Sequence, residues 1–316
     1  MLTYAVKRIG LALLILVVVM SGLFAMVFVI PGDPASIALG PRATPELKAL
    51  LVERMGLDQP WHVQIWSFFR SAATGDLGLD VWSGRPVLGM ILEAFPYTLV
   101  LGVVSLGWSV VLGTALGVLA VVRRGTLADR LLGILSVGMI SVPSFVIALY
   151  SLLIFSVWLG WLPAIGAGEA GDLGSQARAL ILPSFAIGIG WVGYTARLVR
   201  ASMLEVMGAN HIRTARAFGL PERVVVTRYA LRIAIVPTIA ILAVGLGSIL
   251  SSAVFVEYVF SRPGIGTLIT GAVEKRNYPV VMGTVLFMTA FYLVVVTAAD
   301  LLVAGLDPRV RDVLRS

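Results

Sequence analysis

Six long runs of residues without an acidic or basic side chain constrain what this chain can fold into. They cover residues 9–30, 96–122, 131–160, 179–196, 233–256 and 280–299. Each is long enough to cross a bilayer core of about 30 Å as an α-helix, which takes roughly 17–25 residues. Because a helix pairs its own backbone groups in lipid, we expect an all-α integral membrane protein with about six transmembrane helices.

The composition agrees with this expectation. Apolar residues make up 59% of the 316 residues and charged residues 13%, and the mean hydropathy is +0.97, which is typical of a chain in lipid. We expect a single transmembrane domain over residues 1–316. The absence of cysteine and the presence of two histidines exclude disulfides and argue against a zinc cluster.

Basic residues predict the orientation, because loops rich in Lys and Arg stay on the cytoplasmic side. If the N-terminus is inside, most of the 24 Lys and Arg residues fall in inside segments: before the first run, at 123–130, at 197–232 and near the C-terminus. Both termini are therefore expected in the cytoplasm. Because most Arg residues lie beside the apolar runs, where they set the orientation, the high pI does not indicate a nucleic-acid partner.

The long external segment, residues 31–93, contains two short amphipathic helix patterns. Thr44-Pro45-Glu46 reads as an N-cap, a first-turn proline and an acid that favours a helix start, and Gly56 ends the pattern. A second apolar stripe follows Pro60. Such helices lie on the membrane surface or pack on the spans, and direct contact with an external partner is the alternative.

A basic segment, the cytoplasmic loop 204–232, is the most informative part of the chain. It contains a helix-like run from Glu205 to Phe218, a helix stop at Gly219 and a new start at Pro221. A short amphipathic helix that projects from a membrane is suited to insert into a groove on a cytoplasmic partner. The alternative is a basic helix that rests on anionic lipid headgroups.

This loop resembles the coupling loop of the permeases of ABC-type importers, in the form found in peptide transporters. Arg213-Thr214-Ala215-Arg216-Ala217-Phe218-Gly219-Leu220 stands in the place of the family's arginine-threonine-alanine-arginine-alanine-lysine-glycine-leucine run. Phe218 replaces the usual lysine, and Arg213 stands where the wider importer family has a glutamate.

Further motifs of the family follow in order along nearly the whole chain. They are Pro31-Gly32-Asp33-Pro34, Gly56-Leu57-Asp58-Gln59-Pro60, Gly75-Asp76-Leu77-Gly78, Trp161-Leu162-Pro163, Tyr278-Pro279 in the external loop 257–279, and Leu306-Asp307-Pro308-Arg309. Asn277 replaces the aspartate that commonly precedes that tyrosine. The chain resembles dipeptide and oligopeptide permease subunits and their nickel and glutathione relatives, which implies a type I ABC importer permease fold in the bacterial inner membrane.

The resemblance implies a pore subunit, not an enzyme. The three lysines, Lys7, Lys48 and Lys275, do not form a Walker A pattern, so ATP and Mg are expected on two partner ATPase subunits and no cofactor on this chain. A second homologous permease, an external substrate-binding protein and membrane lipid are the other expected partners. The residues expected to couple to the ATPases are Glu205, Gly208, Arg213, Thr214, Ala215, Arg216, Gly219 and Leu220.

Polar residues within the spans suggest where cargo passes. Ser248, Ser251 and Ser252 recur at helical spacing in the fifth run, and Ser141 and Ser144 flank Pro143 in the third. The alternative is that these serines bond to their own helix or to a neighbouring subunit. Glu257, at the outer end of the fifth run, is a candidate gate, and a water-facing interfacial carboxylate is its alternative.

We therefore predict half of the pore of an ATP-driven importer for di- or oligopeptides. The same assembly importing nickel chelates, glutathione or another small solute is the first alternative. An ATP-independent secondary transporter or channel is more distant, since such proteins usually place ionisable groups in mid-membrane to bind ions, and the middles of these runs are nearly free of charge.

Overall fold

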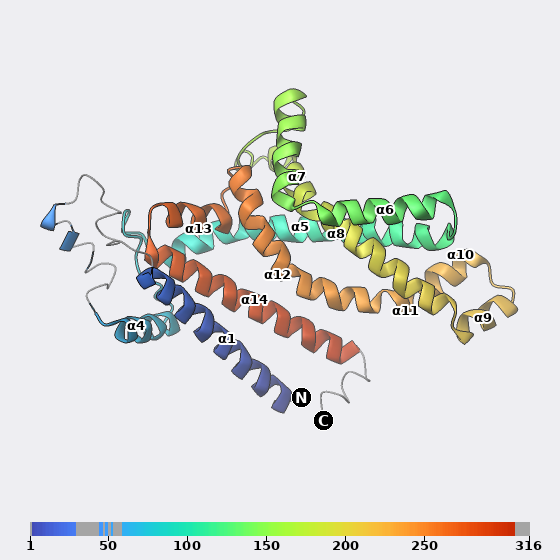
Figure 1. Ribbon diagram of the computed structural model, residues 1–316, viewed down its shortest axis with the longest axis horizontal. Helices are drawn as coiled ribbons and strands as arrows, with labels where there is room; N and C mark the ends of the chain where they lie inside the picture. The colour runs from blue at the N-terminus through green and yellow to red at the C-terminus, as the bar shows by residue number, and fades with distance from the viewer. Residues whose placement is uncertain (1, 30–43, 47, 50–51, 53–58, 307–316) are drawn as a thin grey trace. The chain divides into compact units, whose positions relative to one another are not determined.

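A computed structural model describes residues 2–29, 44–46, 48–49, 52 and 59–306. In these ranges the secondary structure is helical, with one isolated β-bridge between Leu79 and Pro86 and no strand. Motifs at 31–34 and 56–58, most of the predicted helix at 44–56, and residues 307–309 lie outside the described residues. The helices follow in the order drawn in Figure 1: α1 (Leu2–Val29), α4 (Trp61–Ala73), α5 (Val87–Val122), α6 (Leu127–Ser141), α7 (Ser144–Ser151), the π-helix η2 (Leu152–Trp158), α8 (Leu173–Met207), α9 (Asn210–Ala217), α10 (Glu222–Val224), the π-helix η3 (Val225–Ala230), α11 (Leu231–Ala234), α12 (Val236–Val259), α13 (Ile265–Glu274) and α14 (Tyr278–Leu306).

Each of the six apolar runs coincides with a helix or a pair of helices. Helices α5 and α8 and the Tyr278–Ala298 part of α14 are long and apolar enough to cross a membrane, and α6 with the segment Ser144–Trp158 adds a fourth span if the bent pair counts as one. The remaining two runs correspond to α1 and α12, whose described side chains give shorter apolar stretches, Gly10–Ala25 and Gly247–Val259. The predicted all-α membrane architecture is confirmed.

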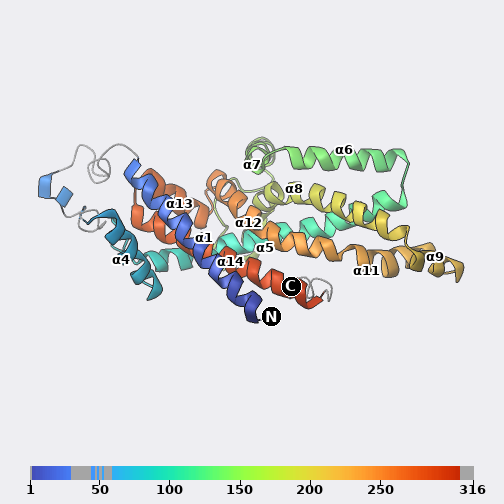
Figure 2. The same cartoon turned by 60° about the horizontal axis from the view of Figure 1, so that its bottom comes forward.

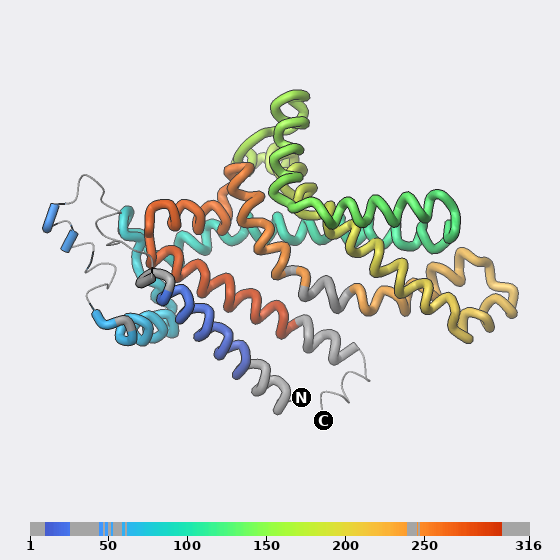
Figure 3. The backbone as a smooth tube through the Cα atoms, in the orientation of Figure 1, coloured from blue at the N-terminus to red at the C-terminus, as the bar shows by residue number. Residues whose placement is uncertain are grey.

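The third run, residues 131–160, is not one continuous helix as predicted. Helix α6 and the helix that starts at Ser144 are bent by 95°, and the turn is visible in the tube of Figure 3. Val142 between them is extended, with φ −91° and ψ 122°. Pro143 explains the break, because proline has no N–H for the helix ladder and disfavours helical geometry at the preceding residue.

The helices form two compact units. Unit 1 comprises Met1–Pro96 and Pro263–Ser316, and unit 2 comprises Tyr97–Arg262. In unit 1, α1 and α14 lie side by side in both views (Figures 1 and 2). The ring of Phe95 contacts the rings of Phe287 and Phe291 edge-on, with centroids 5.2 and 4.8 Å apart. The single permease domain over residues 1–316 stays a prediction.

In unit 2, α8 is the helix against which α6, α7 and α12 pack. Two glycines of α5 permit close backbone approach to it. A Cβ atom at Gly113 would lie 2.7 Å from Cβ of Thr195, and one at Gly117 would lie 2.8 Å from the carbonyl oxygen of Ala196. The small residues of this Gly-x-x-x-Gly pair therefore serve helix packing, as such pairs do in membranes.

Candidate functional site

The basic loop between α8 and α12 is built from two helices rather than one. Helix α8 continues to Met207, Gly208 ends it, and α9 begins at Asn210 after the extended residue Ala209, which has φ −72° and ψ 153°. The predicted continuous helix from Glu205 to Phe218 is therefore wrong at its start. Glu205 and Gly208 lie at the end of α8, and the projecting helix is α9.

One face of α9 packs against the rest of unit 2. Ile212 is 0% exposed and Ala215 5% exposed. They belong to an apolar cluster that also contains Val199 and Met203 of α8 and Val225 of η3. Because buried aliphatic side chains hold helices in fixed relative positions, this inner face joins α9 to the end of α8 and to the start of η3.

A glycine turn ends α9. Gly219 has φ +74°, a backbone conformation that glycine adopts without the steric penalty of a side chain. The N–H of Gly219 donates to the carbonyl oxygen of Arg216 at 2.9 Å and that of Leu220 to Ala215 at 3.3 Å, the pattern of a Schellman motif. Leu220 packs back against the inner cluster. The predicted helix stop at Gly219 is confirmed.

An ion pair spans this turn. The guanidinium of Arg216 donates to Glu222 through Nη2 at 2.6 Å and Nε at 3.1 Å. Each partner stabilises the charge of the other, so the hydrogen bond raises the pKa of Arg216 and lowers the pKa of Glu222. Both side chains are exposed, so the pair adds little stability, and its role is to orient two side chains at the turn.

We define the α9 loop as residues 208–222. The outer face of this loop, opposite the packed face, is open to solvent. Arg213 and Thr214 are exposed, and Phe218 is 82% exposed. Of the eight residues predicted to couple to a partner, five lie on this surface and two, Ala215 and Leu220, face inward; the five are Gly208, Arg213, Thr214, Arg216 and Gly219. Glu205 is exposed on α8, before the loop. The loop therefore presents a basic surface with one exposed aromatic ring.

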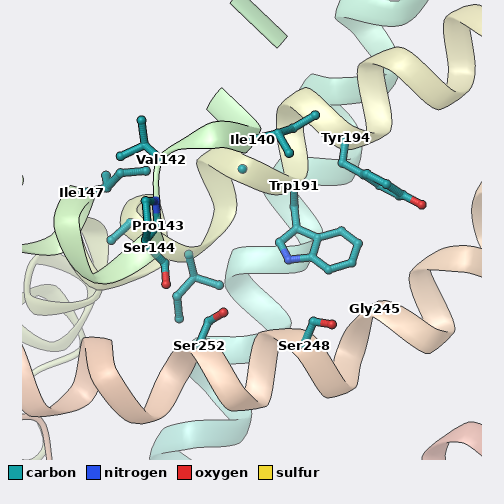
Figure 4. Close-up of a pocket in the computed structure, with 13 residues that line it drawn as sticks. Ile140, Val142, Pro143, Ser144, Ile147, Trp191, Tyr194, Gly245, Ser248 and Ser252 are labelled. Carbon is teal, nitrogen blue, oxygen red and sulfur yellow. The ribbon is translucent and has the colours of Figure 1, made fainter. Parts of the chain in front are cut away.

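A cavity of about 460 Å³ lies in unit 2, beside the break between α6 and α7. Figure 4 shows Ser248 and Ser252 pointing from α12 toward Trp191 of α8, with Ser144 at the start of α7. We call it the serine cavity. Its lining residues are Ile140, Val142, Pro143, Ser144, Ile147, Ala186, Ile187, Gly190, Trp191, Tyr194, Gly245, Ser248 and Ser252.

Two of the predicted pore serines are absent from the lining of this cavity. The hydroxyl of Ser141 donates to the carbonyl oxygen of Val137 at 2.8 Å, and that of Ser251 donates to Gly247 at 3.2 Å. Both bond back to their own helix, which is the alternative considered for all of them. The structure brings Ser144, Ser248 and Ser252 together and leaves Ser141 and Ser251 outside.

Glu257 belongs to a buried polar cluster instead of the cavity. It is 0% exposed, so it is not a water-facing carboxylate, and it accepts a hydrogen bond from Thr98 of α5 at 2.6 Å. Arg262 is 4% exposed, its charge interacts with that of Glu257, and its guanidinium lies 5.9 Å from the ring centre of Tyr97. This cluster joins the outer end of α12 to α5.

A second buried carboxylate, Asp80 of unit 1, was not predicted. Asp80 and Asn277 are 7% and 4% exposed, and the amide of Asn277 donates to Asp80. Burial alone would raise the pKa of Asp80, but hydrogen bonds from Ser83 and Asn277 outweigh it and lower the pKa. Asn277 thus ties the external loop 257–279 to the segment after Gly75-Asp76-Leu77-Gly78. An amide at 277 is suited to this carboxylate, since it can donate where an ionised aspartate cannot.

The sequence matches two models of one family. Residues 109–312 match the binding-protein-dependent transport system inner membrane component, and residues 1–102 match the N-terminal membrane component of the same systems. The chain belongs to this family. It is therefore the membrane permease subunit of an ABC importer, as predicted, and it resides in the bacterial inner membrane.

Relatives cover the whole chain. Glutathione transport system permease proteins GsiC of Shigella flexneri and Escherichia coli are 36% identical over 311 residues, and that of Salmonella paratyphi A is 37% identical, covering 98% of this chain and 99% of each relative. An inward-facing structure of the MetNI methionine ABC transporter is similar in fold, with a TM-score of 0.56, 18% identity, and coverage of 69% of this chain and 96% of that chain.

The family relationship also bears on cofactors. Permease subunits of ABC transporters are separate from the ATPases that hydrolyse ATP, so this chain acts as a pore subunit without enzymatic activity. Among the residues that the structure describes, no group of three or more His, Cys, Asp or Glu side chains is placed to hold a metal ion.

Proposed function

We propose that this chain forms half of the translocation pore of an importer for small peptides, glutathione included. A second homologous permease completes the pore, two cytoplasmic ATPases bind ATP and Mg, and an external binding protein delivers the cargo. In this arrangement both termini and the α9 loop lie in the cytoplasm, where the distribution of Lys and Arg residues favours them.

The packing and exposure of the α9 loop are the observations that support the proposed contact with the ATPases. Its inner face is fixed to the membrane helices through Ile212 and Ala215, while Arg213, Thr214 and Phe218 are exposed. A partner that pushes on the outer face therefore moves the end of α8 and the η3 segment with it. For ATP to drive the cycle, the ATPases must bind one conformation of the permease more tightly than another.

The relatives support the cargo class. Proteins named as glutathione permeases align with this chain from end to end, and glutathione is a tripeptide. Di- and oligopeptides share its amide groups and its size range. Nickel chelates and other small solutes are the competing cargoes, and an uptake assay with each of them separates these possibilities.

A pull-down of the tagged chain from gently solubilised native membranes tests the ATPase contact, with wild type compared with Gly219→Ala. Gly219 has φ +74° and no atom within 4 Å of an added Cβ, so the substitution strains the turn without a clash. We expect an ATPase and a second permease to co-purify with wild type, and the ATPase recovery to fall with Gly219→Ala.

Gly84→Ala is the matched control. Gly84 also has a positive φ, +68°, and also has no atom within 4 Å of an added Cβ, but it lies in the external segment of unit 1. It should retain the ATPase. Equal recovery with both variants would refute the contact through the α9 turn, and wild type purified without any ATPase would refute the proposed assembly.

A further inference from the structure

Three serines of unit 2 differ from their neighbours in what their hydroxyls contact. Seven serines on the helices of unit 2 donate to a carbonyl oxygen of their own helix: Ser105, Ser109, Ser136, Ser141, Ser151, Ser184 and Ser251. Within the described parts of the chain, four helical serines of this unit bond to no protein group: Ser144, Ser202, Ser248 and Ser252. Three of these four, Ser144, Ser248 and Ser252, line the serine cavity. The hydroxyl of a serine in a membrane helix usually donates to a backbone carbonyl oxygen of the same helix. Three hydroxyls without such a bond at one cavity therefore indicate a ligand.

The opposite wall of the cavity is aromatic and tightly held. Gly245 lies on the same face of α12 as Ser248 and Ser252, and a Cβ there would lie 2.2 Å from Cη2 of Trp191. The indole of Trp191 therefore lies directly against the backbone of α12. Tyr194, one turn along α8, contacts Trp191 edge-on with ring centres 5.5 Å apart. This packing fixes an aromatic wall facing the hydroxyls (Figure 4).

The lining also limits the chemistry of the ligand. None of the described lining residues is an Asp, Glu, Lys, Arg or His, and an ionised group is costly to transfer into such surroundings without a partner. A serine hydroxyl both donates and accepts, which matches the C=O and N–H of a peptide unit. The volume of about 460 Å³ is in the range of small-molecule sites.

We propose that the serine cavity is a cargo subsite that binds the amide groups of a peptide through Ser144, Ser248 and Ser252, with an apolar part of the cargo against Trp191. This inference rests on the proposed function, because it requires peptide cargo. It places the charged ends of the peptide outside the cavity.

Reconstituted importer with its own binding protein tests the proposal through import of glutathione and trialanine, each beside an N-methylated analogue whose amides lack the N–H. The variant is Ser248→Ala with Ser252→Ala. Import is measured at saturating cargo-loaded binding protein, so differences between variants arise in the permease. The loss of two hydrogen bonds should lower import of the parent peptides about 5- to 150-fold and reduce the discrimination against the analogues.

Ser251→Ala is the matched control, because it removes a hydroxyl from the same helix that already bonds to Gly247. It should import like wild type, and all variants should retain the ATPase and the second permease. If wild type imports peptides and the double variant matches Ser251→Ala, the subsite is refuted while the proposed function stands. If the assembled wild type imports neither glutathione nor trialanine, the peptide function fails and the subsite fails with it.

Discussion

The α9 loop and the serine cavity both contain residues that sequence patterns single out, but they are built in different ways. The loop is a contiguous stretch, residues 208–222, whose side chains divide between an inner packed face and an outer exposed face. The cavity takes residues from the α6–α7 break, from α8 and from α12. A contiguous surface responds to changes in its own turn, whereas the cavity depends on how three helices pack.

The largest expected loss of stability comes from a substitution on α12 that lies outside the cavity. Such a substitution tests how α12 is held in place without changing the groups that line the cavity. Glu257→Ala should lower the free energy of unfolding by about 3–5 kcal/mol, because it leaves a buried positive charge at Arg262 and a buried hydroxyl at Thr98 without this carboxylate. Thermal unfolding of the detergent-purified protein measures this loss. Glu257→Gln, which keeps an acceptor for Thr98, should be less harmful.

Glu93→Ala is the control for that prediction. Glu93 pairs with Arg85 at 2.6 Å on the surface, where their side chains are 66% and 52% exposed, so its loss should change stability by less than about 1 kcal/mol. Equal losses for Glu257→Ala and Glu93→Ala would contradict the structural role of the buried cluster.

A smaller effect is expected inside the cavity. Gly245→Ala forces Trp191 away from α12 and should destabilise the protein by about 1–3 kcal/mol through overpacking, with a corresponding loss of import. Gly190→Ala is a matched change in the same lining, because an added Cβ there meets nothing closer than the carbonyl oxygen of Met139 at 3.5 Å. Both variants gain the same helix propensity. A Gly190→Ala protein as damaged as Gly245→Ala would show that any added methyl in the cavity has this effect.

The smallest effect on stability is expected at the tip of the α9 loop. Phe218→Asp should alter the free energy of unfolding by no more than about 0.5 kcal/mol, since exposed substitutions rarely do more, yet it should reduce ATPase recovery in the pull-down. Phe218→Lys, which restores the residue usual in the family, should retain the ATPase.

Leu173→Asp provides a comparison at equal exposure, 81% against 82% for Phe218, at the opposite end of α8. It should leave ATPase recovery unchanged. Should both aspartate variants lose the ATPase alike, the effect would come from added charge and not from the α9 surface.

Local rules account for what the sequence predicts correctly. The positive φ at Gly219 and the apolar runs depend on neighbouring residues, so the helix stop and the spans could be predicted. The start of α9 was missed, because the helical pattern from Glu205 to Phe218 continues across Gly208 and only the extended Ala209 divides it. Contacts between distant residues were beyond such rules: Thr98 and Glu257 are 159 positions apart, and nothing in the run around Trp191 indicates that Gly245 lies against it.

The break at Pro143 has an electrostatic consequence for the serine cavity. The positive end of a helix dipole lies at the first residues of the helix. Ser144, the first residue of α7, lies at this end and lines the cavity. A carbonyl or other electron-rich oxygen is therefore favoured there over an ammonium group. The described lining of the cavity contains no ionised residue. The helix start after Pro143 nevertheless makes the cavity favour partial negative charge over positive charge.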